Sequence, residues 1–232
     1  MKVFYDFEFI EGTQDKTFLG INYGKTKFLL EPISVGMVKE TGETFYEVFN
    51  DFNLKEAWNR YDLKPDINNG GMKKVYWIRE NVLKPIWKEY LKNQNTFEKT
   101  HFWNLTSKFC YKTMKLIIKW IGKSKEQVAK EIVEFLELEN NSVELWANYA
   151  DYDHVCLAQC FGKMINLPKG IPFYTKDIQQ LIDSKSWEYR GVSYEGKDLK
   201  RLPNYPKQTN EHNAKNDAIF NKELYEFLQT LK

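Results

Sequence analysis

Hydrophobic and polar positions along the N-terminal part of the chain follow the pattern of β-strands. Residues 3–10 are apolar or aromatic apart from two carboxylates, and the run ends at Glu11-Gly12-Thr13, which is typical of a turn. Two further apolar runs, 33–39 and 44–50, flank Glu40-Thr41-Gly42-Glu43. This spacing predicts a buried first strand and a tight hairpin, so that the chain opens with antiparallel strands.

Three less regular segments interrupt or follow these strands. A short hairpin is predicted at 17–30, where Asn22-Tyr23-Gly24-Lys25 separates two apolar pieces. Apolar residues at helical spacing predict a helix at 77–91, with a kink at Pro85. Residues 93–122 are interpreted as a helical insertion.

The C-terminal half alternates strands and helices. A helix at 124–138 is predicted from Ser124, a good N-cap, with Gln127 three residues later and an apolar stripe beyond. The apolar run 143–150 predicts a central strand, and a helix follows at 152–161. The remaining elements are a strand at 171–174, a helix at 176–182, a long polar loop at 184–211 and a final helix at 213–231. Antiparallel strands followed by this alternation predict an α/β layered fold with a mixed sheet.

Length and composition are those of one folded domain. The 232 residues include 42% hydrophobic and 16% aromatic side chains, enough for a substantial core. There are 34 Lys and Arg residues against 32 Asp and Glu residues, which gives a net charge of +2. A uniformly basic, histone-like nucleic-acid binder is thereby excluded, and any positive surface must come from local segregation of charge.

The cysteines and the apolar runs bear on the compartment. Cys110, Cys156 and Cys160 form no C-x-x-C pair and no even set for disulfides, which favours a reducing environment. Asp6 comes too early for the apolar segment of a signal peptide, and no apolar run is long enough to cross a membrane. A cytoplasmic protein without membrane contact is expected.

The first strand carries two carboxylates, Asp6 and Glu8. Because they are two residues apart on a strand, both leave the same face, about 6 to 7 Å apart. Two like charges in so apolar a strand are unfavourable unless they are protonated or neutralised, and a divalent cation is the usual neutraliser. The alternative is a charged edge strand that keeps the protein soluble.

Acidic residues also follow the predicted strand 143–150. The sequence from Asn148 to His154 lies where that strand ends and a helix begins, the position at which open α/β sheets bind ligands. Asp151 and Asp153 are both candidate ligands there, and each also suits the capping of free helical N–H groups. His154 is interpreted as a surface or packed histidine.

A third cluster opens the last helix. Asp217 continues the apolar stripe formed by Phe220 and Leu224, so its carboxylate is aimed at the core. His212 can approach the same point from the preceding loop, and the small Ala214 lets the helix pack closely. The alternative is an aspartate that stabilises the helix dipole.

Taken together, these residues indicate metal chemistry. Asp6, Glu8, Asp217 and either Asp151 or Asp153, together with His212, match an oxygen-ligand site for Mg²⁺ or Mn²⁺, whereas a zinc site of Cys and His does not fit. Two such ions about 3.5 to 4 Å apart stabilise the attacking and leaving oxygens of phosphoryl displacement. A neutral histidine can accept the proton of the attacking water.

In their order along the chain, these residues resemble the motifs of the DEDD superfamily of 3′-5′ exonucleases, in its histidine-bearing (DEDDh) branch. The corresponding segments are Asp6-Phe7-Glu8 for D-x-E, Asn148 with Tyr152-Asp153 for the asparagine and aromatic-Asp motif, and His212 to Asp217 for H-x-A-x-x-D. The segments similar to the small bacterial exoribonucleases of the ribonuclease AS type are Phe4 to Glu11, Ile33 to Gly36, Trp77 to Arg79 with Val82 and Leu83, Glu144 to Ala147, and Tyr152 to Val155.

The resemblance covers residues 1–50, part of 77–87, 124–183 and 211–231. It implies a ribonuclease H-like fold in a single domain, with a mixed five-stranded sheet, three antiparallel strands followed by parallel ones, and helices around it. It also implies that Asp6, Glu8, Asp153 and Asp217 hold two Mg²⁺ or Mn²⁺ ions and that His212 is the general base. Asp153 is chosen over Asp151 because it follows the aromatic residue.

The same resemblance implies the substrate and the residues that contact it. The implied substrate is the 3′ end of single-stranded RNA, adenylate-rich in the ribonuclease AS type. Phe9 and Ile10 follow D-x-E and are expected to stack on or wedge against the terminal base, with ordinary core packing as the alternative. Asn148 and Tyr152 are further substrate-binding candidates. The oligomeric state stays open at this point: relatives often dimerise, and the Trp-rich insertion could form the interface of a homodimer.

The insertion at 93–122 departs from the family pattern. Its lysines and interleaved aromatic residues could form a basic aromatic surface for RNA, with a solvated helical face as the alternative. The residues concerned are Lys108, Lys112, Lys115, Lys119 and Lys123 with Phe109, Tyr111 and Trp120.

Three functions follow from the sequence. The leading hypothesis is a metal-dependent 3′-5′ exonuclease acting on RNA and releasing nucleoside 5′-monophosphates. A second is a non-catalytic nucleic-acid-binding module of the same fold, which leaves the intact set of carboxylates unexplained. A third keeps the chemistry but acts on DNA or short oligonucleotides, because the contact that recognises a 2′-hydroxyl cannot be located from the sequence.

Overall fold

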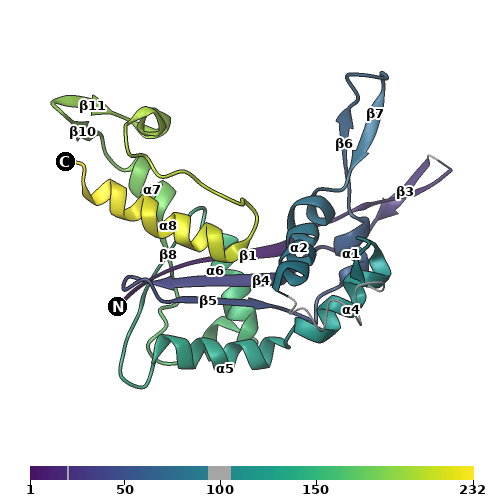
Figure 1. The fold of residues 1–232 in the computed structure, drawn as a ribbon, viewed down its shortest axis with the longest axis horizontal. Coiled ribbons are helices and arrows are strands. Elements are labelled where there is room, and N and C mark those ends of the chain that lie inside the picture. Colours follow the sequence, from purple (N-terminus) through teal and green to yellow (C-terminus); the bar gives the residue numbers. More distant parts are fainter. Residues whose placement is uncertain (20, 94–105) are drawn as a thin grey trace. The chain divides into compact units, whose positions relative to one another are not determined.

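The largest sheet among the described residues is mixed and five-stranded, with the strand order β5-β4-β1-β8-β9 (Figure 1). The computed structural model describes residues 1–19, 21–93 and 106–232. The strands are β1 (Lys2–Gly12), β4 (Leu29–Lys39), β5 (Thr44–Val48), β8 (Glu144–Ala147) and β9 (Lys176–Asp177). β8 pairs in parallel with both β1 and β9, whereas a tight turn joins β4 to β5. The predicted α/β class and mixed sheet are therefore confirmed.

Helices cover both faces of this sheet. On one face, Phe4, Val38 and Trp146 pack with side chains of α7 and α8 in one apolar cluster. On the other, the Tyr5 hydroxyl meets His154 of α6, and Phe45 contacts Phe135 of α5. The helices are α5 (Lys125–Leu136), α6 (Asp151–Cys160), α7 (Ile178–Asp183) and α8 (Ala214–Gln229). Adjacent strand residues thus point to opposite helical layers, as the alternation of β-structure requires.

The chain divides into two compact units. The first contains residues 1–7, 34–47 and 123–232, and the second contains 8–33 and 48–122. The elements of the second unit are β2 (Asp15–Phe18), β3 (Ile21–Lys25), α1 (Leu54–Asn59), β6 (Asp62–Pro65), β7 (Met72–Val75), a π-helical turn (Arg79–Leu83), α2 (Lys84–Asn93) and α4 (Tyr111–Ile121). None of the helices among the described residues is long and apolar enough to cross a membrane.

Aromatic contacts hold the second unit together. Phe109 packs against Trp58 and Trp87, and Tyr111 also contacts Trp58. The Arg79 guanidinium lies over the Trp58 ring and donates a hydrogen bond to the backbone carbonyl oxygen of Trp58. Two aromatic residues of the predicted RNA-binding surface, Phe109 and Tyr111, therefore contribute to packing instead.

The predicted elements with strong periodicity are confirmed. The first strand and the hairpin at residues 33–50 appear as β1, β4 and β5. α5 begins with the expected capping box, in which Ser124 accepts from the Gln127 backbone N–H and the Gln127 side chain accepts from Ser124. α6 and α8 also lie within two residues of their predicted positions.

Three predictions in the first half are met only in part or reach beyond the described residues. The early hairpin exists, but Asn22 and Gly24 lie within β3, because Phe18 pairs with Ile21. The predicted helix at 77–91 is present from residue 77, but it contains a π-helical turn, Arg79–Leu83, before Pro85, a residue without the N–H that regular helical bonding needs. Of the predicted insertion at 93–122, residues 94–105 lie outside the described residues, and α4 is its described helix.

In the second half, the predicted strand at 171–174 is absent. Pro172 has no N–H for a strand ladder, and the edge strand β9 begins five residues after the predicted start. The predicted loop at 184–211 contains a hairpin, β10 (Trp187–Tyr189) with β11 (Val192–Tyr194), and a 3₁₀ helix, Gly196–Arg201. Periodicity gave no indication of this hairpin because its strands are only three residues long and are anchored mainly by the buried Trp187.

Candidate active site

Asp6 and Glu8 lie on β1, as predicted. Asp6 is half-buried and Glu8 is 8% exposed. By strand alternation both side chains share the face of Phe4, which packs with α8. The carboxylates are therefore directed toward the helix that carries the third acidic motif.

Asp153 lies in the first turn of α6, directly after the C-terminal end of β8. It is 5% exposed, and its Oδ1 accepts the backbone N–H of Phe7 at 2.6 Å. Burial raises the pKa of Asp153 to about 7, with the negative charges of Asp177 and Asp217 acting in the same direction. Asp151 is exposed, so the structure favours Asp153 as the member of the second motif that belongs to the site.

Asp217 lies in the first turn of α8 and is 7% exposed. Its two oxygens accept the backbone N–H of His212 at 2.8 Å and the side-chain amide of Gln208 at 2.7 Å. Burial raises the pKa of Asp217, although the Gln208 and His212 hydrogen bonds and the His212 charge oppose the increase. His212 itself has a positive φ of 66°, a conformation that brings its backbone N–H onto Asp217.

The start of α8 packs directly on β4. Ala214 is fully buried, and a Cβ atom placed on Gly36 would lie 2.2 Å from the backbone carbon of Ala214. Only glycine fits at this position, because the obstacle is main chain and not a flexible side chain. The expectation that Ala214 allows close packing is thus supported, and Gly36 is the matching residue on the strand.

The structure brings several of the predicted residues together. One ligand atom from each of Glu8, His212 and Asp217 lies within 4.8 Å of the others. Asp153 and Asp217 are close enough for the charge of one to raise the pKa of the other. Carboxylate oxygens with an imidazole nitrogen form a donor set that suits a hard divalent cation.

Two residues of this region were not singled out by sequence reasoning, Asp177 and Gln208. Asp177 accepts backbone N–H groups from Tyr149 and Ala150 as well as from the start of α7. Its position before a helix, an N-cap pattern, could have identified it. Gln208 lies in a loop nine residues before Asp217, and no local pattern marks it.

The predicted substrate-binding residues have different environments. Ile10 is fully buried, which supports its alternative role in the core, whereas Phe9 is half-buried. Tyr152 is 45% exposed, and the buried Oδ1 of Asn148 has no hydrogen-bond partner in the described part of the chain. His154 is buried beside the Tyr5 hydroxyl, and burial lowers its pKa, so it is the packed histidine that was expected.

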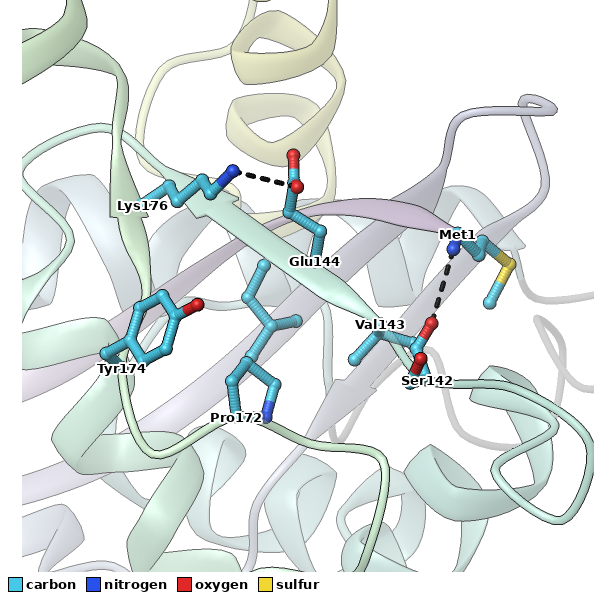
Figure 2. A pocket seen from close by; sticks show the side chains of 8 residues that line it. Met1, Ser142, Val143, Glu144, Pro172, Tyr174 and Lys176 are labelled. Carbon is cyan, nitrogen blue, oxygen red and sulfur yellow. Dashed lines mark hydrogen bonds and ion pairs between the residues drawn. The ribbon is translucent and has the colours of Figure 1, made fainter.

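A separate pocket of about 340 Å³ lies at the N-terminal end of β8 (Figure 2). Its wall includes the ion pair between Lys176 and Glu144, 2.8 Å apart, and the Ser142 carbonyl, which accepts from the Met1 amine at 3.2 Å. None of the carboxylates of the three motifs lines it. This pocket is therefore distinct from the candidate active site.

Fold and site together define an α/β protein with a buried acidic cluster and a histidine at the end of a mixed sheet. Residues 1–229 match the family model described as the 3′-5′ exoribonuclease Rv2179c-like domain, and the chain belongs to this family. Two similar proteins are the 3′-5′ exoribonucleases Rv2179c and MT2234.1 of Mycobacterium tuberculosis, from strains H37Rv and CDC 1551. Each is 28% identical over 219 residues, which is 94% of this chain and 87% of the relative.

Proposed function

We propose that this protein is a metal-dependent 3′-5′ exoribonuclease that releases nucleoside 5′-monophosphates from single-stranded RNA. The observation that carries the proposal is the burial of Asp153 and Asp217 close to one another, in a chain of an exoribonuclease family. We further assign it to the DEDDh branch, with a ribonuclease H-like fold and a similarity to the ribonuclease AS type.

The metal ligands in this proposal are Asp6, Glu8, Asp153 and Asp217, holding two Mg²⁺ or Mn²⁺ ions. Buried carboxylates with raised pKa values are unfavourable as anions, and a divalent cation removes that penalty. Bound ions would supply an activated water and stabilisation of the leaving 3′-oxygen. The proximity of His212 to Glu8 and Asp217 supports the same assignment.

His212 is proposed as the general base. Its imidazole lies beside Asp217, whose oxygen accepts the His212 backbone N–H, so the ring is tied to the carboxylate cluster. A neutral imidazole nitrogen there accepts one proton from the attacking water. The phosphodiester bond to the terminal nucleotide then breaks, and the penultimate nucleotide keeps the 3′-oxygen.

The substrate contacts in this proposal come from residues around the carboxylates. Phe9 follows Glu8 on β1 and is partly accessible, and Tyr152 exposes its ring one residue before Asp153. Asn148 offers an amide oxygen without an internal partner among the described residues. The adenylate preference of the ribonuclease AS type makes poly(A) the first substrate to test.

The decisive experiment is a time course with 5′-labelled and 3′-labelled poly(A), mixed RNA and single-stranded DNA, in Mn²⁺, Mg²⁺ or EDTA. Release of mononucleotides from the 3′ end, stopped by EDTA, is expected. Asp217→Ala should abolish hydrolysis with the fold retained, while His212→Ala should lower the rate by at least about 100-fold and keep Mn²⁺ binding. Full activity of Asp217→Ala would contradict the assignment, and preferential cleavage of DNA would change the substrate.

A further inference from the structure

Tyr149 lies in the short turn between β8 and α6 and has an unfavourable backbone conformation. Its φ is +57°, in the left-handed region that bulky residues rarely adopt. Glycine or asparagine would occupy this position with less strain. Strained residues persist where the surrounding structure holds them, and they are concentrated at functional sites.

Asp177 holds this turn in place. Its Oδ1 lies 3.3 Å from the backbone nitrogen of Tyr149, and its Oδ2 accepts the N–H of Ala150 at 2.9 Å. The same carboxylate accepts the N–H of Gln179 at 2.6 Å, at the start of α7. Asp177 of β9 is also paired with Ala147, the last residue of β8 before the turn. The turn is therefore held by β8, which leads into it, and by β9 beside it.

The strained conformation of Tyr149 does not bury its side chain. The Tyr149 side chain is 70% exposed, although its neighbours Ala147 and Ala150 are fully buried. Within the described part of the chain, its ring and hydroxyl make no ring contact or hydrogen bond. A flat aromatic surface is thus presented to solvent by a turn whose backbone is held by hydrogen bonds.

We propose that Tyr149 stacks on a nucleobase of the RNA strand bound at the candidate active site, with Asp177 as the residue that positions it. This inference rests on the proposed function, because it uses RNA as the ligand. Tyr149 lies four residues before Asp153, and the turn leads directly into the helix that carries that carboxylate. Tyr152, 45% exposed in the first turn of the same helix, offers a second aromatic surface nearby in sequence.

Stacking is the interaction that such a residue supplies best. Every base has a π face, so one tyrosine can hold successive nucleotides as the chain is shortened. Purines offer a larger face than pyrimidines, so the contribution of Tyr149 should be greatest on adenylate-rich RNA. The divalent cations held by the carboxylates would then position the phosphate, while Tyr149 would hold a base.

The test compares Tyr149→Ala, Tyr149→Phe and Tyr149→Gly with the control Val155→Ala, which shortens an apolar side chain, 46% exposed, on α6, the helix that follows the turn. KM and kcat are measured on oligo(A), and binding of labelled oligo(A) is measured by anisotropy in Ca²⁺. Tyr149→Ala should raise KM and Kd about 5- to 100-fold, with a much smaller change in kcat. Tyr149→Phe should restore both constants to within about twofold, because the ring is kept.

The glycine variant separates substrate binding from folding. Tyr149→Gly should raise the unfolding temperature by relieving the strain, and yet weaken oligo(A) binding as much as Tyr149→Ala does.

Wild-type KM and Kd in Tyr149→Ala, or an equal loss of oligo(A) binding in Val155→Ala, would overturn the inference. If wild-type protein binds oligo(A) through Tyr149 but does not cleave it, the proposed function fails and this inference stands. If oligo(A) is cleaved and Tyr149→Ala changes neither KM nor Kd, the proposed function stands and this inference fails.

Discussion

At the scale of single residues, Asp153 shows most clearly how folding prepares the candidate site. Asp153 is 5% exposed, and its carboxylate accepts the backbone N–H of Phe7. Burial is the largest cause of its raised pKa, followed in the same direction by the charges of Asp177 and Asp217. Without a cation, the fold therefore favours the protonated acid below about pH 7, where a cation must displace that proton to bind.

This pKa predicts how stability depends on pH in the absence of metal. Between the ordinary value of 3.8 and about 7, the folded protein binds more protons at Asp153 than the unfolded chain does, so stability falls as pH rises through this range. The loss is at most on the order of 4 kcal/mol for a shift from 3.8 to about 7. In EDTA, the unfolding temperature should be lower at pH 8 than at pH 5.

Two comparisons check the origin of this effect by thermal unfolding. Asp153→Asn, which cannot ionise, should flatten the decrease, and Mn²⁺ should raise the wild-type unfolding temperature most at pH 8. The raised pKa of Asp217 acts with the same sign and leaves a residual slope in Asp153→Asn. An identical pH profile for wild type and Asp153→Asn would show that Asp153 does not carry the effect.

At the scale of elements, the approach of α8 to β4 determines where the third motif lies. Asn213 caps α8 by accepting the N–H of Asn216, and Asp217 follows one helical turn later. Gly36 allows the backbone at Ala214 to touch β4. The position of His212 and Asp217 thus depends on a glycine that is distant in sequence and carries no functional group.

Gly36→Ala should therefore disturb the site without touching any of its side chains. The added Cβ would lie 2.2 Å from backbone atoms of Ala214, so α8 must shift or the strand must bend. We expect destabilisation by about 1 to 3 kcal/mol and weaker Mn²⁺ binding, measured by thermal unfolding and metal titration. The control is Ser34→Ala, two residues earlier on β4, which adds no atom. Wild-type metal affinity in Gly36→Ala would argue against the role of this close packing.

At the scale of the whole molecule, charge is separated between the two units although the net charge is only +2. The second unit has 17 Lys and Arg residues against 11 Asp and Glu residues, and the first has 17 against 21. The first unit is therefore the acidic one, and it contains all of the proposed metal ligands apart from Glu8. A bound cation would offset part of its negative charge. The excess positive charge lies in the unit that contains α4 and suits a polyanion.

Substitution of the exposed lysines of α4 tests whether the positive charge of the second unit contributes to RNA binding. Lys112, Lys115 and Lys119 are exposed, while Lys123, just beyond the helix, is paired with Glu47 and Glu131 at 2.8 Å. Lys112→Ala with Lys119→Ala should raise KM for RNA several-fold and reduce the slope of log KM against log salt by about 1.4. The control pair, Lys163→Ala with Lys169→Ala, removes equal charge from the acidic unit. If both pairs of substitutions change KM and its salt dependence equally, α4 is a solvated helical face and not an RNA-binding surface.

The sequence by itself determined the elements whose pattern is local. β1, the hairpin of β4 and β5, the capping box of α5, and the helices α6 and α8 follow from alternation, helical spacing and capping, which act between residues a few positions apart. The resemblance carried by the three acidic motifs also predicted a 3′-5′ exoribonuclease family, because the residue types and spacing of the motifs are visible along the chain.

Only the tertiary structure decided what depends on contacts between distant residues. It buried Asp153 and exposed Asp151, which the sequence places two residues apart in the same cluster. It also brought Asp177 to the turn at Tyr149, Gln208 to Asp217 and Gly36 to Ala214. Trp187 likewise turned part of an expected loop into a hairpin by entering the core. Such features arise from packing between distant segments, and no local periodicity records them.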